Sequence, residues 1–586
     1  MKSNYIFLLI VLITSSVQAQ KQFKDISSEK KHVIVSDPVK PEKIPTVKGI
    51  TLWQNDFSDN SEWTYDNTSA PYLNWEITTA ADTIPVSALS PAIFTTVANG
   101  FAFINSDAQG QNGMQNSNMT YNGSINCTGY PNVSLVFEQQ YRTYLDTRII
   151  RVSNDGGTTW TDFYITDGNE PTAQNTANPD IASINISSVA GNQANVKIQL
   201  NYQGNWGWYW AIDDIKVIET DQYDLKLQSI AWGTDGAFGE RLPYYQVPTL
   251  QVAPINFGGA LKNIGVQDIN DATFTAVING IYNGATAPSF LAAESLDTIW
   301  CSTTFAPSAS ITTHSVQLTA ITSNIEPDTI NNVLPDLNIQ VNANIYARDR
   351  GVILGGISNA GQGFEVGNMF DVFQDDVLYG IDTYIHPNTE VGSEIFTKLY
   401  YNNPGTGVFD FVDESAPYVI QAGDLGQKIT FPLQNFQPLT ANESYMAMVG
   451  SFGDGGASND LVCATSGSSA PQTAFYYDYT DQTWYYTSSS PMVRMNFDPS
   501  LGLEANANAV PFTIYPNPSN DQFTVKLSNG NNATIEIVDL KGNSIKKTNA
   551  NSMQTNISTT SISNGVYLLT ITTNGNTFTK KIVVQH

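Results

Sequence analysis

Short runs of alternating apolar and polar residues fill the chain from about residue 50 to its end. The runs are rich in Thr, Val, Ile, Tyr and Trp, and they are separated by Asn, Gly and Ser. A period of two is typical of half-buried strands, and the separating residues are typical of turns. Because no long stretch repeats with the period of a helix, the pattern predicts an all-β protein built as a string of β-sandwiches.

The breaks between these runs predict the domain organisation. A chain of 586 residues is too long for one hydrophobic core, and roughly 150 residues per domain gives about four domains. We expect, in chain order, a signal peptide at 1–19, a flexible Lys-rich leader at 20–49, sandwiches at 50–220, 222–343 and 344–498, a linker at 499–510 and a small sandwich at 511–586.

The first residues have the pattern of a secretory signal. Lys2 is followed by the apolar run 5–13 and by the small-residue cleavage site Val17-Gln18-Ala19. The run is shorter than the roughly 20 apolar residues that span a bilayer, and no later segment qualifies. We therefore expect an exported chain without a transmembrane segment.

The stretch Ser153 to Trp160, SNDGGTTW, resembles the Asp-box of sialidase-type propellers. Asp and two Gly favour a tight turn, Thr caps it by hydrogen bonding, and Trp covers it. A propeller repeats such a unit in each blade, at roughly 40 to 50 residues, and this chain has one copy. We interpret the stretch as a hairpin between two strands of a sandwich.

Three elements in order give the 50–220 segment a family resemblance: Asp56-Phe57-Ser58, the Ser153 hairpin, and Trp210 to Ile215. They resemble the cleaved-adhesin or MAM-like jelly roll of bacterial surface proteins. The 222–343 segment, with Asn263-Ile264-Gly265, resembles Ig-like adhesion modules of the CARDB type, which implies a spacer. The 344–498 segment predicts a second jelly-roll-like sandwich of unassigned family, with an aromatic hairpin turning at Thr480 to Thr483.

The last 76 residues carry the most specific motifs in the chain. The segment resembles the type A C-terminal sorting domain of type IX secretion substrates, with the matching sorting-signal residues Tyr515, Pro516, Asn517, Pro518, Gly565, Tyr567, Lys580 and Lys581. The resemblance implies a small Ig-like fold, handling by the type IX secretion machinery, and a secreted or outer-membrane-anchored cell-surface location. The alternative reading from pattern alone is one more Ig-like domain.

The net charge of −27, from 54 acidic and 27 basic residues, disfavours nucleic acid and anionic membranes as partners. It is compatible with calcium, which prefers carboxylate and carbonyl oxygen. First and last strands of a jelly roll often lie side by side, so we expect Asp56 to meet Asp213 or Asp214 at one rim and hold a structural calcium ion. The alternative is that one Asp caps a turn while the other is solvated.

Residues suited to catalysis are scarce. The chain has four His and three widely spaced Cys, and neither HExxH nor GxSxG occurs. We interpret Cys127, Cys301 and Cys463 as buried thiols outside any disulfide framework. The sequence therefore predicts no catalytic residues, and we expect a protein that is not an enzyme.

Aromatic clusters are the candidate ligand contacts, because exposed rings stack on the apolar faces of sugars. The candidates are Trp206, Trp208, Tyr209, Tyr477 and Trp484. Core packing and cross-strand pairing are the alternative explanations. We expect a secreted or surface, adhesin-like protein that binds glycan or protein ligands. The alternatives are a secreted glycan or peptide hydrolase with an unrecognised site in 344–498, and an envelope scaffold protein.

Overall fold

The computed structural model supports an all-β architecture and divides into two units, residues 1–499 and residues 500–586. It describes residues 22–26, 34–36, 49–68, 73–79, 98–110, 114–142, 144, 146–165, 176, 179–327, 329–455, 461–501, 512–517, 519–527, 533–539, 542–550, 552, 554–573 and 576–586. The expected signal peptide and nearly all of the expected linker lie outside these residues. The expectation of β-sandwich domains is confirmed, because the described elements form separate, mostly antiparallel sheets around hydrophobic cores.

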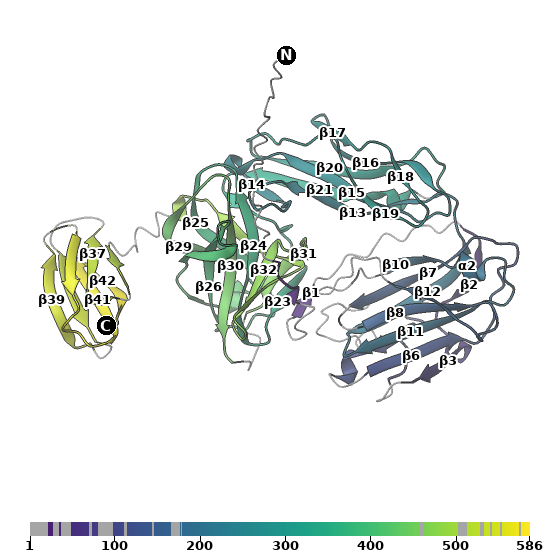
Figure 1. The fold of residues 1–586 in the computed structure, drawn as a ribbon, viewed down its shortest axis with the longest axis horizontal. Coiled ribbons are helices and arrows are strands. Elements are labelled where there is room, and N and C mark those ends of the chain that lie inside the picture. The colour runs from purple at the N-terminus through teal and green to yellow at the C-terminus, as the bar shows by residue number, and fades with distance from the viewer. Residues whose placement is uncertain are drawn as a thin grey trace, which may run out of the picture. The chain divides into compact units, whose positions relative to one another are not determined.

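The first sandwich has its core between residues 57 and 217. One sheet has the order β10-β7-β12-β5-β4, with β2 also paired to β12, and the other has the order β3-β6-β11-β8-β9 (Figure 1). Its elements are β2 (Thr51–Asn55), β3 (Trp63–Asn67), β4 (Glu76–Thr78), β5 (Phe101–Asn105), β6 (Met114–Tyr121), β7 (Val133–Arg142), β8 (Asp146–Ser153), β9 (Thr161–Tyr164), β10 (Asp180–Asn185), α2 (Ser187–Ala190), β11 (Lys197–Asn205) and β12 (Tyr209–Glu219).

The two ends of this sandwich meet, as the sequence predicted. Asn55 of β2 is in register with Ile215 of β12, so the first and last strands are neighbours. The predicted hairpin is also confirmed, because β8 pairs with β9 on either side of the SNDGGTTW turn. Strands β9 and β10 are edge strands of the two sheets, so both border the same open side of the sandwich.

The second sandwich has its core between residues 225 and 339. Its sheets have the orders β13-β15-β19 and β14-β21-β20-β16-β17, with β18 paired to β16. The strands are β13 (Leu225–Thr234), β14 (Gln246–Pro248), β15 (Ile255–Asn263), β16 (Ile269–Ile278), β17 (Tyr282–Ala285), β18 (Ser289–Leu291), β19 (Leu296–Trp300), β20 (Thr312–Ile321) and β21 (Val333–Asn342).

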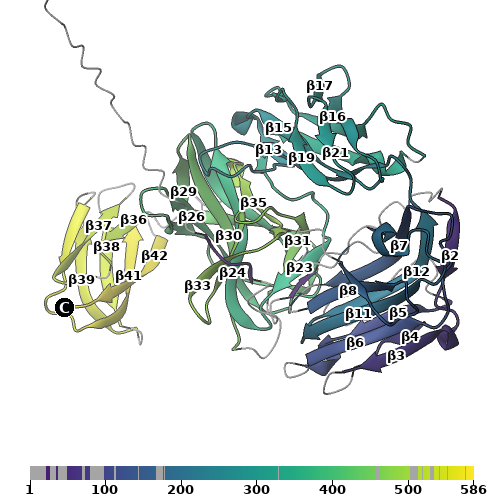
Figure 2. The same ribbon diagram turned by 45° about the vertical axis from the view of Figure 1, so that its right-hand side comes forward.

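The third sandwich is built on a sheet with the order β27-β26-β30-β24-β32-β33, in which β28 also pairs with β26 (Figure 2). Two smaller sheets have the orders β1-β23-β31-β34 and β22-β35-β25-β29. The strands are β1 (Ile34–Ser36), β22 (Ile345–Tyr346), β23 (Gly355–Ser358), β24 (Gln362–Val372), β25 (Asp376–Tyr384), β26 (Glu394–Asn403), β27 (Val408–Glu414), β28 (Tyr418–Val419), β29 (Lys428–Leu439), β30 (Glu443–Gly453), β31 (Cys463–Ser468), β32 (Ala474–Asp478), β33 (Thr483–Tyr486), β34 (Ser489–Pro491) and β35 (Val493–Asn496).

The central strands of the large sheet are buried on both faces, since β24 is buried at every position but its first. On one face, the Asn368 side chain donates to the carbonyl oxygens of Pro491 and Val493 from the smaller sheets. On the opposite face, the Phe475 ring contacts Phe23 of the leader, with centroids 5.6 Å apart, and Phe238 of the second sandwich, with centroids 6.2 Å apart. Sequence-distant segments thus complete this core.

The expectation of a flexible leader is wrong for residues 22–26 and 34–36. Ile26 is completely buried in the third core, and the Gln472 side chain accepts a hydrogen bond from the Phe23 amide and donates one to the Phe23 carbonyl. Strand β1, purple in Figure 1, pairs with β23. The reason is that Ile26 joins the third core and Phe23 packs against it, which local composition does not reveal.

The second sandwich is also joined to the third by polar contacts. The carboxylate of Asp371 accepts hydrogen bonds from the Phe238 amide at 2.8 Å and from the Ser444 hydroxyl at 2.8 Å. The Tyr244 hydroxyl accepts one from the Asp371 amide. Burial raises the pKa of the Asp371 carboxyl group, so these donors compensate an otherwise unfavourable buried charge.

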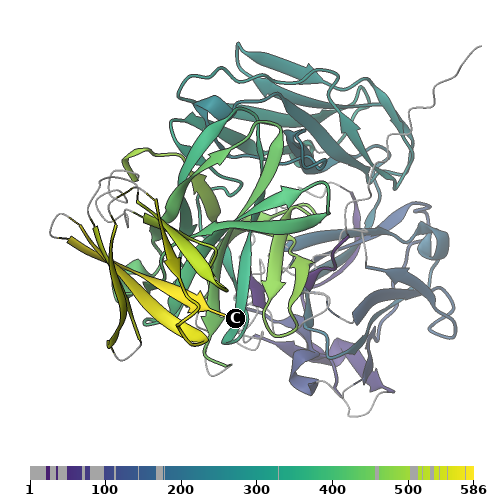
Figure 3. The ribbon, with the colours of Figure 1, turned by 60° about the vertical axis from the view of Figure 1, so that its left-hand side comes forward.

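The C-terminal unit is a small sandwich with its own core, shown in yellow in Figure 3. Its sheets have the orders β36-β37-β40 and β39-β38-β41-β42. The strands are β36 (Phe512–Tyr515), β37 (Gln522–Leu527), β38 (Ala533–Val538), β39 (Ser544–Ala550), β40 (Gln554–Ser558), β41 (Gly565–Thr573) and β42 (Asn576–Val584).

The docked leader gives a first prediction. Because the Ile26 side chain is completely buried, Ile26→Ala should lower the free energy of unfolding of the third sandwich by about 2–5 kcal/mol. Lys24→Ala is the matched control, since the Lys24 side chain is exposed and the substitution keeps the Lys24 carbonyl oxygen, which accepts a hydrogen bond from the Tyr486 amide. Denaturant unfolding of the full chain followed by tryptophan fluorescence measures both. Equal stability of the Ile26 variant and the native chain would contradict the docking.

Candidate ligand-binding site

The Asp155 side chain organises the hairpin between β8 and β9. Its carboxylate accepts hydrogen bonds from the amides of Thr158 and Thr159, both at 2.9 Å, and from the hydroxyls of Thr159 at 2.6 Å and Ser153 at 2.7 Å. Bonds from Thr159 and Ser153 hold the pKa of the Asp155 carboxyl group well below its usual range. Gly156 and Gly157 have φ angles of +77° and +95°, which favour glycine. The hairpin thereby fixes the position of β9.

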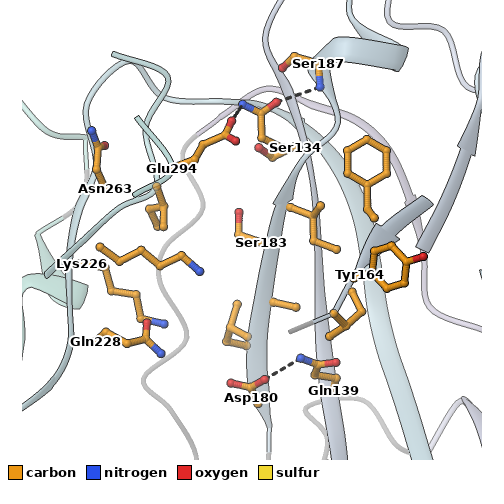
Figure 4. Close-up of a pocket in the computed structure, with 18 of the residues that line it drawn as sticks. Ser134, Gln139, Tyr164, Asp180, Ser183, Ser187, Lys226, Gln228, Asn263 and Glu294 are labelled. Atoms are coloured by element: carbon orange, nitrogen blue, oxygen red, sulfur yellow. Dashed lines mark hydrogen bonds between the residues drawn. The ribbon is translucent and has the colours of Figure 1, made fainter. Parts of the chain in front are cut away.

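A cleft of about 450 Å³ lies where β9 and β10 of the first sandwich face β13 and β15 of the second. Figure 4 shows Lys226 and Gln228 extending from one wall toward Asp180 and Ser183 in the other. Leu225 and Leu227 of β13 are in the second core, so alternation along the strand puts Lys226 and Gln228 on its outer face. The volume lies within the roughly 300–1,000 Å³ of small-molecule sites.

Buried side chains hold the acidic wall of the cleft in place. The Trp210 indole donates to the amide oxygen of Gln139 at 3.0 Å, and the amide nitrogen of Gln139 donates to Asp180 at 2.7 Å. Trp210 is completely buried and Gln139 almost so. The Trp210 motif, which contributed to the jelly-roll resemblance, therefore acts through Gln139 to orient a carboxylate at the cleft.

Two further features complete the site. The Asn185 side chain donates to the Glu294 carboxylate across the cleft and accepts a hydrogen bond from the Ser187 amide. Tyr164, at the end of β9, lines the cleft and is 59% exposed. The cleft thus combines an accessible aromatic ring with amide, hydroxyl, carboxylate and ammonium groups, which is the chemistry that binds hydroxyl-rich ligands.

Two of the aromatic candidates in the first sandwich are wrong as ligand contacts. Trp208 is 4% exposed, beneath the Arg142 guanidinium at 4.4 Å from its ring centroid, and Tyr209 is completely buried. Both pack with Phe101 and Phe103 because β12 and β5 are adjacent. Trp206 is half-buried, and its ring lies nearly perpendicular to that of Tyr144 with the centroids 6.3 Å apart, so its role as a contact stays a prediction.

The aromatic hairpin of the third sandwich forms as predicted, with Tyr477 in register with Trp484 and their rings 4.9 Å apart. Both rings are half-buried, and Trp484 also packs on Tyr400. Beside them, the buried Glu365 carboxylate accepts hydrogen bonds from the hydroxyls of Tyr400 and Tyr479 and from the Lys398 ammonium group. Ligand contacts by Tyr477 and Trp484 stay a prediction.

The three expected calcium ligands lie in β12 or directly after β2, the strand that pairs with it. Asp56 is exposed and accepts hydrogen bonds from the Ser58 amide and hydroxyl and from Asn99, and the Ser58 bonds lower its pKa. Asp213 is completely buried and accepts from the Asp214 amide. No cluster of three or more His, Cys, Asp or Glu side chains suited to a metal occurs among the described residues. Calcium binding by Asp56, Asp213 and Asp214 stays a prediction.

The scarce nucleophile and base candidates lie in structural positions. Cys127 and Cys463 are buried, and burial raises the pKa of the Cys127 thiol to about 11 and of the Cys463 thiol to about 12. Cys301 is half-buried, and burial raises its thiol pKa also. Burial lowers the pKa of His314 and His386. The prediction of buried thiols is therefore confirmed for Cys127 and Cys463, while Cys301 is partly accessible.

Several sorting-signal residues tie the two ends of the C-terminal unit together. The Asn517 side chain donates to the Lys581 carbonyl at 3.1 Å and accepts from the Val583 amide at 2.7 Å. The Lys580 ammonium donates to the Phe512 carbonyl, and the Tyr567 hydroxyl to the Ser563 carbonyl. Tyr515 precedes a cis bond to Pro516, Gly565 begins β41, and Pro518 lies outside the described residues.

Comparison with known families assigns this unit. Residues 513–585 match the family model described as the secretion system C-terminal sorting domain. The C-terminal unit is a type IX secretion sorting domain. The sorting domain directs the chain through the type IX secretion machinery to a secreted or cell-surface location. Within the described part of the chain, no helix has the length and apolar composition needed to cross a membrane.

Solved structures that match parts of the chain have low sequence identity to it. The K1 cleaved adhesin domain of Lys-gingipain from Porphyromonas gingivalis W83 is 14% identical, with a TM-score of 0.21 over 29% of this chain and 98% of that domain. TmCBM61 in complex with β-1,4-galactotriose is 11% identical, with a TM-score of 0.20, and the match covers 29% of this chain and 99% of that one. A Bacteroides uniformis β-glucuronidase is 10% identical, with a TM-score of 0.22, and the match covers 50% of this chain and 32% of that one. No curated protein matches the chain.

Sequence reasoning missed the residues that form the cleft. Tyr164, Asp180, Lys226 and Lys262 come from four strands that end or begin far apart in the chain. Each lies in an ordinary alternating strand pattern and has no local motif around it. The sequence pointed to two of these residues indirectly. The SNDGGTTW hairpin precedes the strand that ends in Tyr164, and Trp210 positions Asp180 through Gln139.

Removing the Asp155 carboxylate tests the hairpin. Asp155→Ala should speed amide hydrogen exchange at Thr158 and Thr159, because both amides lose their acceptor. In the native chain the contribution of Asp155 is complete above the usual Asp pKa of about 3.9 and is lost as the pH falls below it, because folding lowers this pKa. Asp162→Ala, which removes an exposed ion pair with Arg151 in the same hairpin, is the control. Unchanged protection at both threonines would contradict the role of Asp155.

Deleting residues 500–586 tests whether the C-terminal unit is needed for export but not for the folding of the first unit. The deletion leaves the three cores of the first unit intact, so the truncated chain should fold but stay inside the cell envelope. Cell fractionation with thermal unfolding of the recovered protein measures both outcomes. Delivery of the truncated chain to the cell surface or medium at the native level would contradict the assignment.

Proposed function

We propose that this chain is a secreted, non-catalytic binding protein that holds a glycan in the cleft between its first two sandwiches. One observation supports the proposal most directly. The cleft is lined by the accessible Tyr164 ring and by the polar groups of Gln228, Ser183 and Asp180. A ring of this kind stacks on the apolar face of a sugar, while amides, hydroxyls and carboxylates take its hydroxyl groups.

The polar groups of the cleft are held in position before a ligand arrives. Trp210 and Gln139 orient Asp180, and Asn185 engages Glu294. The Asp155 hairpin fixes the strand that ends in Tyr164. Pre-organised groups lose less conformational freedom on binding, which favours affinity in a site of modest size.

Several charged side chains in the interior of the third sandwich are engaged in structural contacts, which supports binding over hydrolysis as the role of the chain. Arg494 and Asp349 form a buried ion pair, and Lys428 binds the buried Asp382 at 2.7 Å. Arg348 donates to the Thr473 hydroxyl and the Ser469 hydroxyl in the interior, and burial lowers its pKa to about 10. These groups stabilise the interior of the segment in which a hydrolase site was the alternative.

Tyr164→Ala tests the proposed contact. The variant should bind a polysaccharide retained by the native chain at least about tenfold more weakly, because it loses the stacking surface, while its unfolding temperature changes little. Affinity electrophoresis on a panel of neutral and acidic polysaccharides, followed by calorimetry on the positives, measures the effect. Phe290→Ala removes an aromatic side chain of similar exposure, 57%, from the second sandwich outside the cleft and is the matched control.

Two outcomes would contradict the proposal. Equal affinity of the Tyr164 variant and the native chain would remove the cleft as the binding site. Saturable release of reducing sugars or peptides by the native chain, measured on the same panel and on casein, would replace binding with hydrolysis as its function.

A further inference from the structure

The outer face of the four-stranded sheet in the sorting domain carries apolar side chains that its core does not use. Ile537 of β38 and Leu569 of β41 are in the core, so alternation along each strand puts Val538 and Leu568 on the outer face. These two half-buried residues are in register with each other, and Leu568 is also in register with Lys581 of β42. A row of two apolar residues and one lysine thus crosses three strands at the surface.

A second apolar pair lies beside this row. Val566 of β41 is 39% exposed and is in register with Val583 of β42, two positions along each strand from the first row. An antiparallel sheet with one packed face ordinarily presents polar residues on the other, as Thr570 and Thr579 do farther along the same strands. The apolar residues therefore form a distinct patch. We define the sorting face as Val538, Val566, Leu568, Lys581 and Val583.

The edge of the sheet next to the sorting face is already occupied by the chain itself. The Val583 amide donates to the Asn517 side chain, and the Ser519 amide donates to the Val583 carbonyl at 2.9 Å. The Gln585 amide in turn donates to the Ser519 carbonyl at 2.8 Å. A partner that added a strand to this edge would have to displace these bonds. The side chains of Val566 and Lys581 are exposed without any such displacement.

The sorting domain has an excess of basic residues in a chain that is strongly acidic as a whole. Residues 511–586 contain six lysines and three acidic residues, whereas the whole chain has 27 basic and 54 acidic residues. The six are Lys526, Lys541, Lys546, Lys547, Lys580 and Lys581, and the three are Asp521, Glu536 and Asp539.

Lys581 is the lysine of the sorting face. Its side chain is exposed and forms no ion pair within the described residues, whereas Lys547 on the same sheet forms one with Glu536 at 3.3 Å. A charge at the rim of an apolar patch favours partners of opposite charge and speeds their association. The complementary surface is therefore an apolar one bordered by carboxylate groups.

We infer that the sorting face is the surface through which the type IX secretion machinery recognises this chain. The occupant is a protein component of that machinery with an apolar, acid-bordered surface. The family match assigns a sorting role to residues 513–585, so this unit has a partner to bind. Contacts inside the unit account for the sorting-signal residues Asn517 and Lys580, whose side chains bind backbone groups, while the Lys581 side chain points to solvent. Recognition by a partner accounts for Lys581 and for the apolar residues beside it.

Export of the full chain from a bacterium with a type IX secretion system tests the inference. Lys581→Glu should lower the exported fraction at least about fivefold, because it replaces attraction to the acidic partner by repulsion. Lys581→Gln should lower it less, because it removes the attraction alone. Val566→Thr keeps the shape of the side chain and its β-branch but places a hydroxyl group in the apolar contact, so it should lower export as well. Quantifying the chain in the medium, on the cell surface and in the periplasm measures all three.

Two further measurements separate recognition from other causes of a loss. Calorimetric unfolding of the purified full chain should give the native unfolding temperature for Lys581→Glu and Val566→Thr, because both side chains are exposed. Sedimentation should show that the native chain is a monomer, which excludes a second copy as the occupant of the sorting face. Lys526→Glu, at an exposed lysine of β37 in the other sheet, is the matched control and should be exported like the native chain.

Four outcomes would overturn the inference. Native export of both Lys581→Glu and Val566→Thr would show that the machinery contacts another surface. Equal losses with Lys581→Glu and Lys526→Glu would make the attraction a property of the net charge. Losses that occur only together with a lowered unfolding temperature would assign these residues to folding, and a native dimer that the variants dissociate would make a second copy the occupant. Each outcome leaves the proposed glycan cleft, which lies in the other unit, unaffected.

Discussion

The burial of both faces of the large sheet in the third sandwich is the constraint on which the first unit depends. A strand such as β24, apolar or buried almost from end to end, needs a layer of side chains on each side. The sandwich itself supplies one layer, and Phe23, Ile26 and Phe238 belong to the other. Since these residues come from the leader and the second sandwich, the third core joins segments that alternation alone would separate into independent domains.

This joining has consequences for the candidate site. The second sandwich is held to the third through Phe238 and Asp371, and its β13 and β15 strands form one wall of the cleft. The other wall belongs to edge strands of the first sandwich. A site at such a boundary draws its side chains from rigid strands, and its positioning groups, such as Gln139, from the interior. The cleft therefore draws pre-organised polar groups from both sandwiches.

The sorting domain, unlike the third sandwich, takes its core residues from one continuous segment of the chain. Its core is complete within the unit, and its motif residues fasten the last strand to the first, as Asn517 does with Lys581 and Val583. Because these contacts all lie within the unit, the motif can be recognised without knowledge of the rest of the chain. The export signal and the proposed binding cleft therefore lie in separate units of the chain.

The sequence by itself determined the all-β class, the SNDGGTTW hairpin and the sorting domain, because each depends on alternation or on the residues of a specific motif. The neighbouring first and last strands of the first sandwich followed from the jelly-roll resemblance. It misplaced Trp208 and Tyr209, since an aromatic run has the same local pattern whether a neighbouring strand covers it or not. Tertiary structure alone decided that Ile26 is a core residue and that Lys226 and Lys262 face a cleft. The physical reason is that burial and charge pairing depend on which distant strands become neighbours, and a period of two contains no information about that choice.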